Sequence, residues 1–169
     1  MTRSLGLGLA AALLAALIAA GCGYGTGLAV KKSGIESIGV AFFGNDTLER
    51  DVERDFQPEL ARALQDLCDA PIDRIDRAST VIQGTVRQYH RRSGIRSPEN
   101  KLLETGIYVE VEAALYVRGE PNPSRGPVRA STWVGFVIEP TGEHERQARE
   151  RAFRHVAEEL VLDLFAPVH

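Results

Sequence analysis

The chain has 169 residues, of which 25% are charged, and its formal net charge is −3. This length suits one domain with a hydrophobic core and is short for two. The mild acidity argues against a nucleic-acid-binding protein, because Lys and Arg dominate one face of such proteins.

The first 21 residues have the pattern of a secretory signal peptide. Arg3 is followed by an apolar run over residues 5–20 that ends in small residues. A positive start, a short apolar segment and small residues before a boundary are typical of a cleaved signal. The run is also shorter than the roughly 20 apolar residues that a membrane-spanning helix needs. We therefore expect residues 1–21 to be removed, the alternative being an uncleaved signal anchor.

Cys22 follows Ala20-Gly21 directly, and this arrangement resembles the lipobox of bacterial lipoproteins. In that family the cysteine receives a diacylglyceryl group, the signal is cut just before it, and the new amino group is acylated. The resemblance implies a lipidated tether over residues 22–34, because two or more acyl chains hold a protein on a bilayer stably. Gly23, in place of Asp, favours transfer to the outer membrane in that family.

A strand and a helix are predicted next. Residues 35–43 alternate in polarity as a strand does, and residues 44–47 have turn composition. Apolar side chains then recur at helical spacing from Val52 onward. Pro58 lies inside this stripe, and proline costs roughly 3 kcal/mol in a helix interior but is tolerated in a first turn. We therefore expect the regular helix to begin near Gln57.

Three further strands and a second helix complete the pattern. Strands are predicted at residues 80–89, 106–118 and 130–138, and the middle one has six alternating apolar positions. A helical apolar stripe follows within residues 143–165, consisting of Ala148, Ala152, Phe153, Val156, Ala157, Leu160, Val161 and Leu164. The order β-α-β-β-β-α predicts an α+β fold over residues 35–166. We expect a two-layer sandwich of a mostly antiparallel four-stranded sheet and two helices packed on it.

Catalysis has little support in the residue pattern. No nucleophile elbow or phosphate-binding glycine loop is present. The histidines are far apart and lack metal-binding partners at helical or strand spacing: His90, His144, His155 and His169. We expect no enzyme, no metal and no cofactor. Cys68 would have no intrachain partner once Cys22 is acylated, and we interpret it as a small buried apolar residue.

Two groups of residues are candidate binding surfaces. Positive charge gathers at the end of one predicted strand and in the following loop, on Arg87, Arg91, Arg92 and Lys101. Arginine binds phosphate in bidentate fashion, so this group suits an anionic headgroup. The alternative is a solvated loop that its charges keep soluble.

The second group is aromatic. Tyr108, Tyr116 and Trp133 are predicted on the sheet face that bears polar side chains. Aromatic residues on a nominally exposed face suit protein contact. The alternative is that long neighbours such as Arg118 cover them.

Six segments, spread over nearly the whole mature chain, resemble one known family: Cys22-Gly23-Tyr24, residues 38–47 (IGVAFFGNDT), 58–64 (PELARAL), 82–86 (IQGTV), 108–116 and the helix over 145–165. They are similar, in the same order, to the LptE family of lipopolysaccharide-assembly lipoproteins. The resemblance implies a non-enzymatic outer-membrane lipoprotein that contacts lipopolysaccharide. It would act as a plug and assembly subunit inside a lipopolysaccharide-translocating β-barrel of the LptD type.

The start of the domain also resembles a second class of protein. A strand followed by Phe-x-Asn-x-Thr and a helix is similar to periplasmic lipoprotein domains that activate cell-wall synthases or build secretion pores. Those domains need a long stalk to cross the periplasm. Here only about a dozen residues separate Cys22 from the first strand, a reach of some 40 Å at roughly 3.3–3.6 Å per residue. This short reach favours the barrel-plug interpretation.

Overall fold

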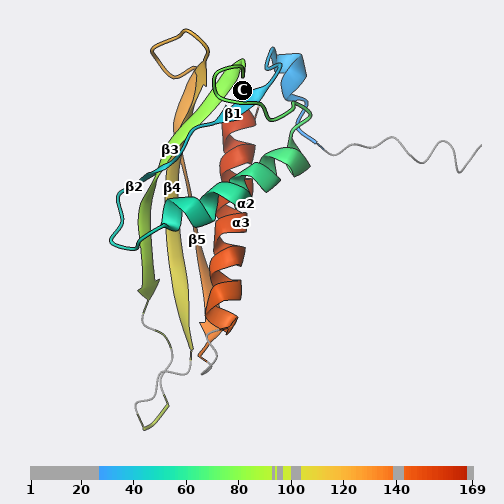
Figure 1. The fold of residues 1–169 in the computed structure, drawn as a ribbon. Coiled ribbons are helices and arrows are strands. Elements are labelled where there is room, and N and C mark those ends of the chain that lie inside the picture. The colour runs from blue at the N-terminus through green and yellow to red at the C-terminus, as the bar shows by residue number, and fades with distance from the viewer. Residues whose placement is uncertain (1–26, 93, 95–96, 100–103, 139–142, 167–169) are drawn as a thin grey trace, which may run out of the picture.

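The computed structural model describes residues 27–92, 94, 97–99, 104–138 and 143–166. They form two layers, a five-stranded sheet and two helices packed on one of its faces (Figure 1). The helices are α2 (Val52–Leu67) and α3 (Glu143–Phe165). The strands are β1 (Ile38–Val40), β2 (Gly44–Asn45), β3 (Thr80–Arg92), β4 (Glu104–Val117) and β5 (Arg125–Val137). The predicted α+β sandwich is confirmed.

The sheet has one strand more than the sequence indicated. Its order is β1-β3-β4-β5, with β1 and β2 both parallel to β3 and the three long strands antiparallel to one another. The additional strand is β2, at positions expected to form a turn. The chain stays beside β3 after β1, and the Asp46 N–H donates to the carbonyl of Val86 at 3.0 Å. A two-residue strand is too short to show any periodicity.

The last strand begins at Arg125, five residues before its expected start. Pro127 therefore lies within a strand, where the proline-rich segment led us to expect a loop. β5 is the terminal strand of the described sheet, and a proline without an N–H is tolerated on such an edge. Pairing with β4 continues to Arg125, which lies opposite Leu115.

Helix α2 also begins earlier than expected, at Val52 rather than near Gln57, and Pro58 lies inside it. The side chains of Val52, Phe56 and Leu60 are all fully buried. Burying an apolar side chain of this size contributes about 1.5–3 kcal/mol. Burial of Val52 and Phe56 in the first two turns thus offsets the roughly 3 kcal/mol that an interior proline costs.

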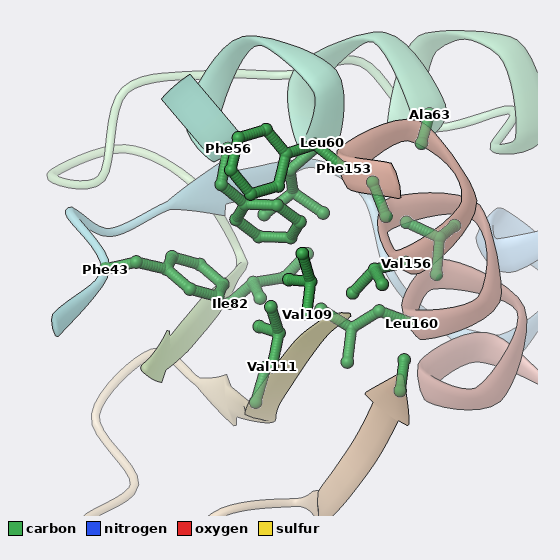
Figure 2. Packing of buried hydrophobic residues seen from close by; sticks show 14 of the residues in the cluster. Phe43, Phe56, Leu60, Ala63, Ile82, Val109, Val111, Phe153, Val156 and Leu160 are labelled. Carbon is green, nitrogen blue, oxygen red and sulfur yellow. The ribbon is translucent and has the colours of Figure 1, made fainter. Parts of the chain in front are cut away.

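The core lies between the helices and the sheet, as Figure 2 shows. Phe56 of α2 is at its centre, with ring centroids 5.3 Å from Phe43 and 6.1 Å from Phe153 of α3. The sheet contributes buried side chains such as Ile82 of β3 and Val109 of β4. The predicted stripe of α3 is confirmed, since every member is at most 1% exposed: Ala148, Ala152, Phe153, Val156, Ala157, Leu160, Val161 and Leu164.

We expected the domain to begin at residue 35, but packed structure begins further upstream. A 3-10 turn, η1 (Val30–Ser33), lies against the main body, and Val30 is only 3% exposed. The Leu28 N–H donates to the carbonyl of Leu67 at the end of α2. Part of the segment that we expected to be tether therefore packs against the domain.

Candidate interaction surface on the open sheet face

The sheet face opposite the helices is not covered by any described element. Side chains alternate along β4, so that Ile107, Val109 and Val111 are buried beneath the helices while Tyr108 and Glu110 point to the open face. The two helices contact β3, β4 and β5 from one side, as Figure 1 shows. The other side of the sheet is therefore the one on which side chains are accessible to a partner.

Aromatic side chains gather at one end of this open face. Tyr108 and Trp133 are register partners on β4 and β5, and the His90 ring of β3 lies 5.0 Å from that of Tyr108. Trp133 remains 53% exposed. We call His90, Tyr108 and Trp133 the aromatic cluster. The sequence analysis did not group His90 with these residues, because the predicted strand ended at residue 89. In the structure β3 continues to Arg92, and His90 pairs with Tyr108.

Two glycines make room for the Trp133 indole. A Cβ on Gly106 would lie 2.3 Å from the indole, and one on Gly135 would lie 2.9 Å from it. The ring therefore lies against bare backbone of β4 and β5. Its orientation is held by close packing while about half of its surface stays accessible, which is the arrangement of an amphipathic contact residue.

Tyr116, the third aromatic residue in the predicted group, lies elsewhere on the face. It is eight residues from Tyr108 on the same strand, which is about 27 Å at roughly 3.4 Å per residue. There it lines a shallow depression together with Pro123 and Pro127. Nearby Arg118 donates to the carbonyl of Ala78 at 3.0 Å. The open face thus brings Tyr108 and Trp133 together and leaves Tyr116 apart.

Ion pairs occupy the middle of the open face. Glu112 accepts hydrogen bonds from Arg87 and from Arg129, at 2.5 and 2.6 Å, and Arg87 also pairs with Asp46. The hydrogen bond from Arg87, and then that from Arg129, holds the pKa of the Glu112 carboxyl below its usual value. Arg87, a predicted phosphate contact, is therefore engaged by two carboxylates.

The basic residues predicted as one site do not converge in the described structure. Arg91 lies opposite Ile107, whose side chain is buried beneath the helices, and it pairs with Glu145 of α3. Arg87 is bonded to Glu112 on the open face. The two guanidinium groups thus lie on opposite sides of the sheet. The Arg92 side chain, Lys101 and the lipidation residue Cys22 lie outside the described residues.

A polar network that the sequence analysis missed joins the two helices. Glu59 of α2 is 9% exposed and pairs with Arg62 at 2.7 Å and with Arg154 of α3 at 3.4 Å. Arg149 of α3 pairs with Asp55 at 3.0 Å, and its guanidinium carbon lies 5.0 Å from the Tyr89 ring centroid. The pairs between the two helices leave no local pattern, because Glu59 and Arg154 are 95 positions apart. The network fixes α2 against α3.

The described residues offer no metal centre, since no group of three or more His, Cys, Asp or Glu side chains among them is arranged to hold an ion. Cys68 is half-buried, and burial followed by the charge of Asp69 raises the pKa of its thiol to about 11. The thiol is therefore protonated and weakly nucleophilic near neutral pH. Neither α2 nor α3 has the length and apolarity that crossing a membrane requires.

Comparison with known proteins identifies the fold. No protein-family model matches the chain, and no curated protein matches its sequence. The fold is similar to that of PelC from Paraburkholderia phytofirmans, solved as a dodecamer, with a TM-score of 0.50 and 15% identity over 79% of this chain and 89% of that one.

Two further structures with this fold are described as lipoproteins. A putative lipoprotein from Caulobacter crescentus matches with a TM-score of 0.50 and 16% identity, over 79% of this chain and 91% of its own. Rare lipoprotein B from Shewanella oneidensis matches with a TM-score of 0.50 and 14% identity, over 74% and 90%. This chain therefore shares a fold with solved bacterial lipoproteins.

Proposed function

We propose that this protein is a lipoprotein anchored in the outer membrane through acylated Cys22. Its domain acts as a plug and assembly subunit of a lipopolysaccharide-translocating β-barrel of the LptD type. The lipobox, the Gly23 that follows it and a fold shared with bacterial lipoproteins support the anchor. The observation that carries the partner role is the open sheet face with its exposed aromatic cluster.

The composition of the open face is that of a protein interface. Protein interfaces are enriched in aromatic residues and Arg, and Trp, Tyr and Arg supply most binding hot spots. Here Trp133 and Tyr108 lie at one end, and Arg87 and Arg129 lie near the middle. The three long strands of 13 or 14 residues span about 45 Å at roughly 3.4 Å per residue. An elongated domain of this kind suits the lumen of a large barrel, which needs a plug.

Lipopolysaccharide phosphates are the proposed ligands of Arg87, Arg91, Arg92 and Lys101, and Arg87 and Arg91 would bind separate phosphates because they lie on opposite sides of the sheet. A phosphate oxygen accepts the same guanidinium hydrogen bonds as a carboxylate oxygen. Binding at Arg87 would therefore exchange Asp46 or Glu112 for phosphate, and binding at Arg91 would exchange Glu145. The proposal includes no catalytic step, no cofactor and no nucleic acid.

Purification of the native protein from outer membranes tests the partner role. We expect one large barrel protein to be recovered with it in a roughly one-to-one ratio. The complex should survive high salt, because a plug interface buries apolar and aromatic surface in addition to charges that salt screens. Recovery of a peptidoglycan synthase without a barrel would contradict the proposal.

Trp133→Ala tests the face itself. We expect it to lower recovery of the barrel by about tenfold or more, since truncating an interface Trp typically costs 2 kcal/mol or more of binding free energy. Leu162→Ala is the control, because Leu162 is an exposed apolar residue (45%) on α3, which packs on the opposite face of the sheet. Equal loss in both variants would argue against a specific role of the open face.

A second candidate function is a periplasmic lipoprotein that scaffolds a secretion pore or activates a cell-wall synthase. The observation in its favour is β5, a 13-residue strand that ends the described sheet and leaves one edge available for pairing. PelC, which has a similar fold, forms a dodecamer. The native mass of the purified assembly separates the two functions. A ring of identical subunits without a barrel supports the scaffold.

A further inference from the structure

A mostly apolar pocket of about 500 Å³ lies at the end of the domain where the chain enters from its N-terminal segment. It is enclosed by η1, the end of β4, the start of β5 and the last turn of α3, which Figure 1 shows at the same end of the molecule. Its deepest lining residues are Val30, Leu115 and Leu164, each at most 3% exposed. Its volume is in the range of small-molecule sites.

Two of the polar residues that line this pocket are bonded within the chain. The Ser124 N–H and hydroxyl both donate to the carbonyl of Leu115, at 2.8 and 3.1 Å. The Arg125 guanidinium donates to the carbonyl of Ala166, just beyond α3. Most of the other lining residues are apolar, so the pocket mainly offers apolar surface. It therefore suits a ligand that is apolar along its length.

The position of the pocket relates it to the membrane anchor. Leu28 and Ala29 line the pocket and follow Cys22 by six and seven residues. Six extended residues reach roughly 20 Å at 3.3–3.6 Å each. Lys31 and Lys32 are exposed on η1, and basic residues near a bilayer are attracted to anionic headgroups. A chain acylated at Cys22 would thus keep this pocket close to the leaflet that holds its anchor.

We propose that this pocket takes one acyl chain of a phospholipid from the leaflet in which the Cys22 anchor is inserted. The inference rests on the lipidation in the proposed function. An acyl chain leaving the bilayer exchanges one apolar environment for another, so the gain comes from removing the pocket walls from water. The bound lipid would hold this end of the domain against the leaflet. The aromatic cluster would then lie about 30 Å away, since Tyr108 is nine residues from Val117 along β4.

Photolabelling of the full mature protein tests this site. The acylated protein is reconstituted in vesicles of phosphatidylethanolamine and phosphatidylglycerol that contain a phospholipid with a diazirine near the end of one acyl chain. After illumination, peptide mass spectrometry locates the label. We expect it on residues lining the pocket, such as Leu28, Val117 and Phe165. Label distributed evenly over exposed apolar residues elsewhere, such as Ile75 and Val137, would overturn the proposal.

Two pocket variants and one control sharpen the test. Val117→Asp introduces a carboxylate into the lining, and Ser33→Trp fills the pocket from its exposed rim without adding charge. Each should reduce labelling about tenfold, because a charge or a bulky ring in the pocket excludes the chain. Val137→Asp should leave labelling unchanged, since Val137 is similarly exposed (54% against 42% for Val117) but lies outside the pocket. Undiminished labelling in both pocket variants would overturn the assignment.

A further arm identifies the source of the acyl chain. Protein whose own anchor carries the diazirine is placed in unlabelled vesicles, and label in the pocket would show that the anchor fills it and would overturn the phospholipid assignment. The intact mass of the protein reports acylation of Cys22 independently. Loss of the anchor would contradict the proposed function. An acylated protein with an unlabelled pocket would contradict only the present inference.

Discussion

Glu112 connects three strands of the open face through its carboxylate. It accepts hydrogen bonds from Arg87 of β3 and Arg129 of β5, and its side chain is 15% exposed. The two arginines stabilise its charged form, and the pKa of Glu112 is lowered in the folded protein. A carboxyl whose pKa falls on folding contributes stability above its unfolded-state pKa. That contribution disappears as the pH falls through the folded-state pKa.

Glu112→Gln should therefore lower the free energy of unfolding near pH 7. Its difference from the parent protein should shrink as the pH falls below the ordinary Glu pKa of 4.5, because the parent carboxyl becomes protonated as well. Urea unfolding near pH 7 and near pH 3 measures both differences. Glu120→Gln, at an exposed position in the turn after β4, is the control and should change neither value. If Glu112→Gln lowered the free energy of unfolding equally at both pH values, the ion pairs of Glu112 with Arg87 and Arg129 would not explain the loss.

Helix α2 shows how tertiary packing overrides a local helix-breaking residue, Pro58. Val52 and Phe56 are buried in its first two turns, so the helix extends to Val52 in spite of Pro58. Polar contacts with α3 add to this apolar packing, through the pairs that Arg154 and Arg149 make with Glu59 and Asp55. The proline thus lies in a helix that its tertiary contacts stabilise.

Pro58→Ala is expected to raise the free energy of unfolding by about 1–3 kcal/mol. Alanine restores a backbone N–H that can donate to the carbonyl of Arg54 and has the highest helix propensity. Thermal and urea unfolding of the variant measure the change. Ala61→Pro, one turn further along α2, is the converse control and should destabilise by about 3 kcal/mol or more. A Pro58→Ala variant less stable than the parent would show that the helix geometry depends on proline.

The hydrophobic core gives an expectation for the whole molecule. Within the part of the chain that the structure describes, which begins at residue 27, the core cluster extends from Val30 to Leu164 and joins both helices to the sheet. We therefore expect anchoring and folding to be separable. A domain with this organisation can lose its membrane attachment and keep its structure.

Cys22→Ala is accordingly expected to leave the unfolding midpoint unchanged while abolishing lipidation and outer-membrane retention. Metabolic labelling with a fatty-acid analogue and membrane fractionation measure the two losses. Cys68→Ala is the matched control and should keep its label, because Cys68 lies at the end of α2, far along the chain from the lipobox. Label that persists on the Cys22→Ala protein would contradict the lipoprotein assignment.

The local residue pattern was sufficient to predict the helices and strands that bury one face. The stripe of α3 and the alternation of β4 were predicted residue by residue, because the periods of 3.6 and 2 appear directly in the order of apolar residues. The α+β sandwich followed from the order of these elements. The two-residue strand β2 and the first turns of α2 were not predicted, since both depend on partners distant in the chain.

The arrangement of the candidate site depended on tertiary structure. Arg87 and Arg91 are four residues apart and looked like one basic cluster, yet the register irregularity between Val86 and Gln88 places them on opposite sides of the sheet. The ion-pair partners of Arg87 are Asp46, which directly follows β2, and Glu112 of β4, whereas that of Arg91 comes from α3. A sequence shows which side chains carry charge and aromatic surface. Strand pairing and helix packing decide which of them meet, because these contacts join residues 25 to 54 positions apart.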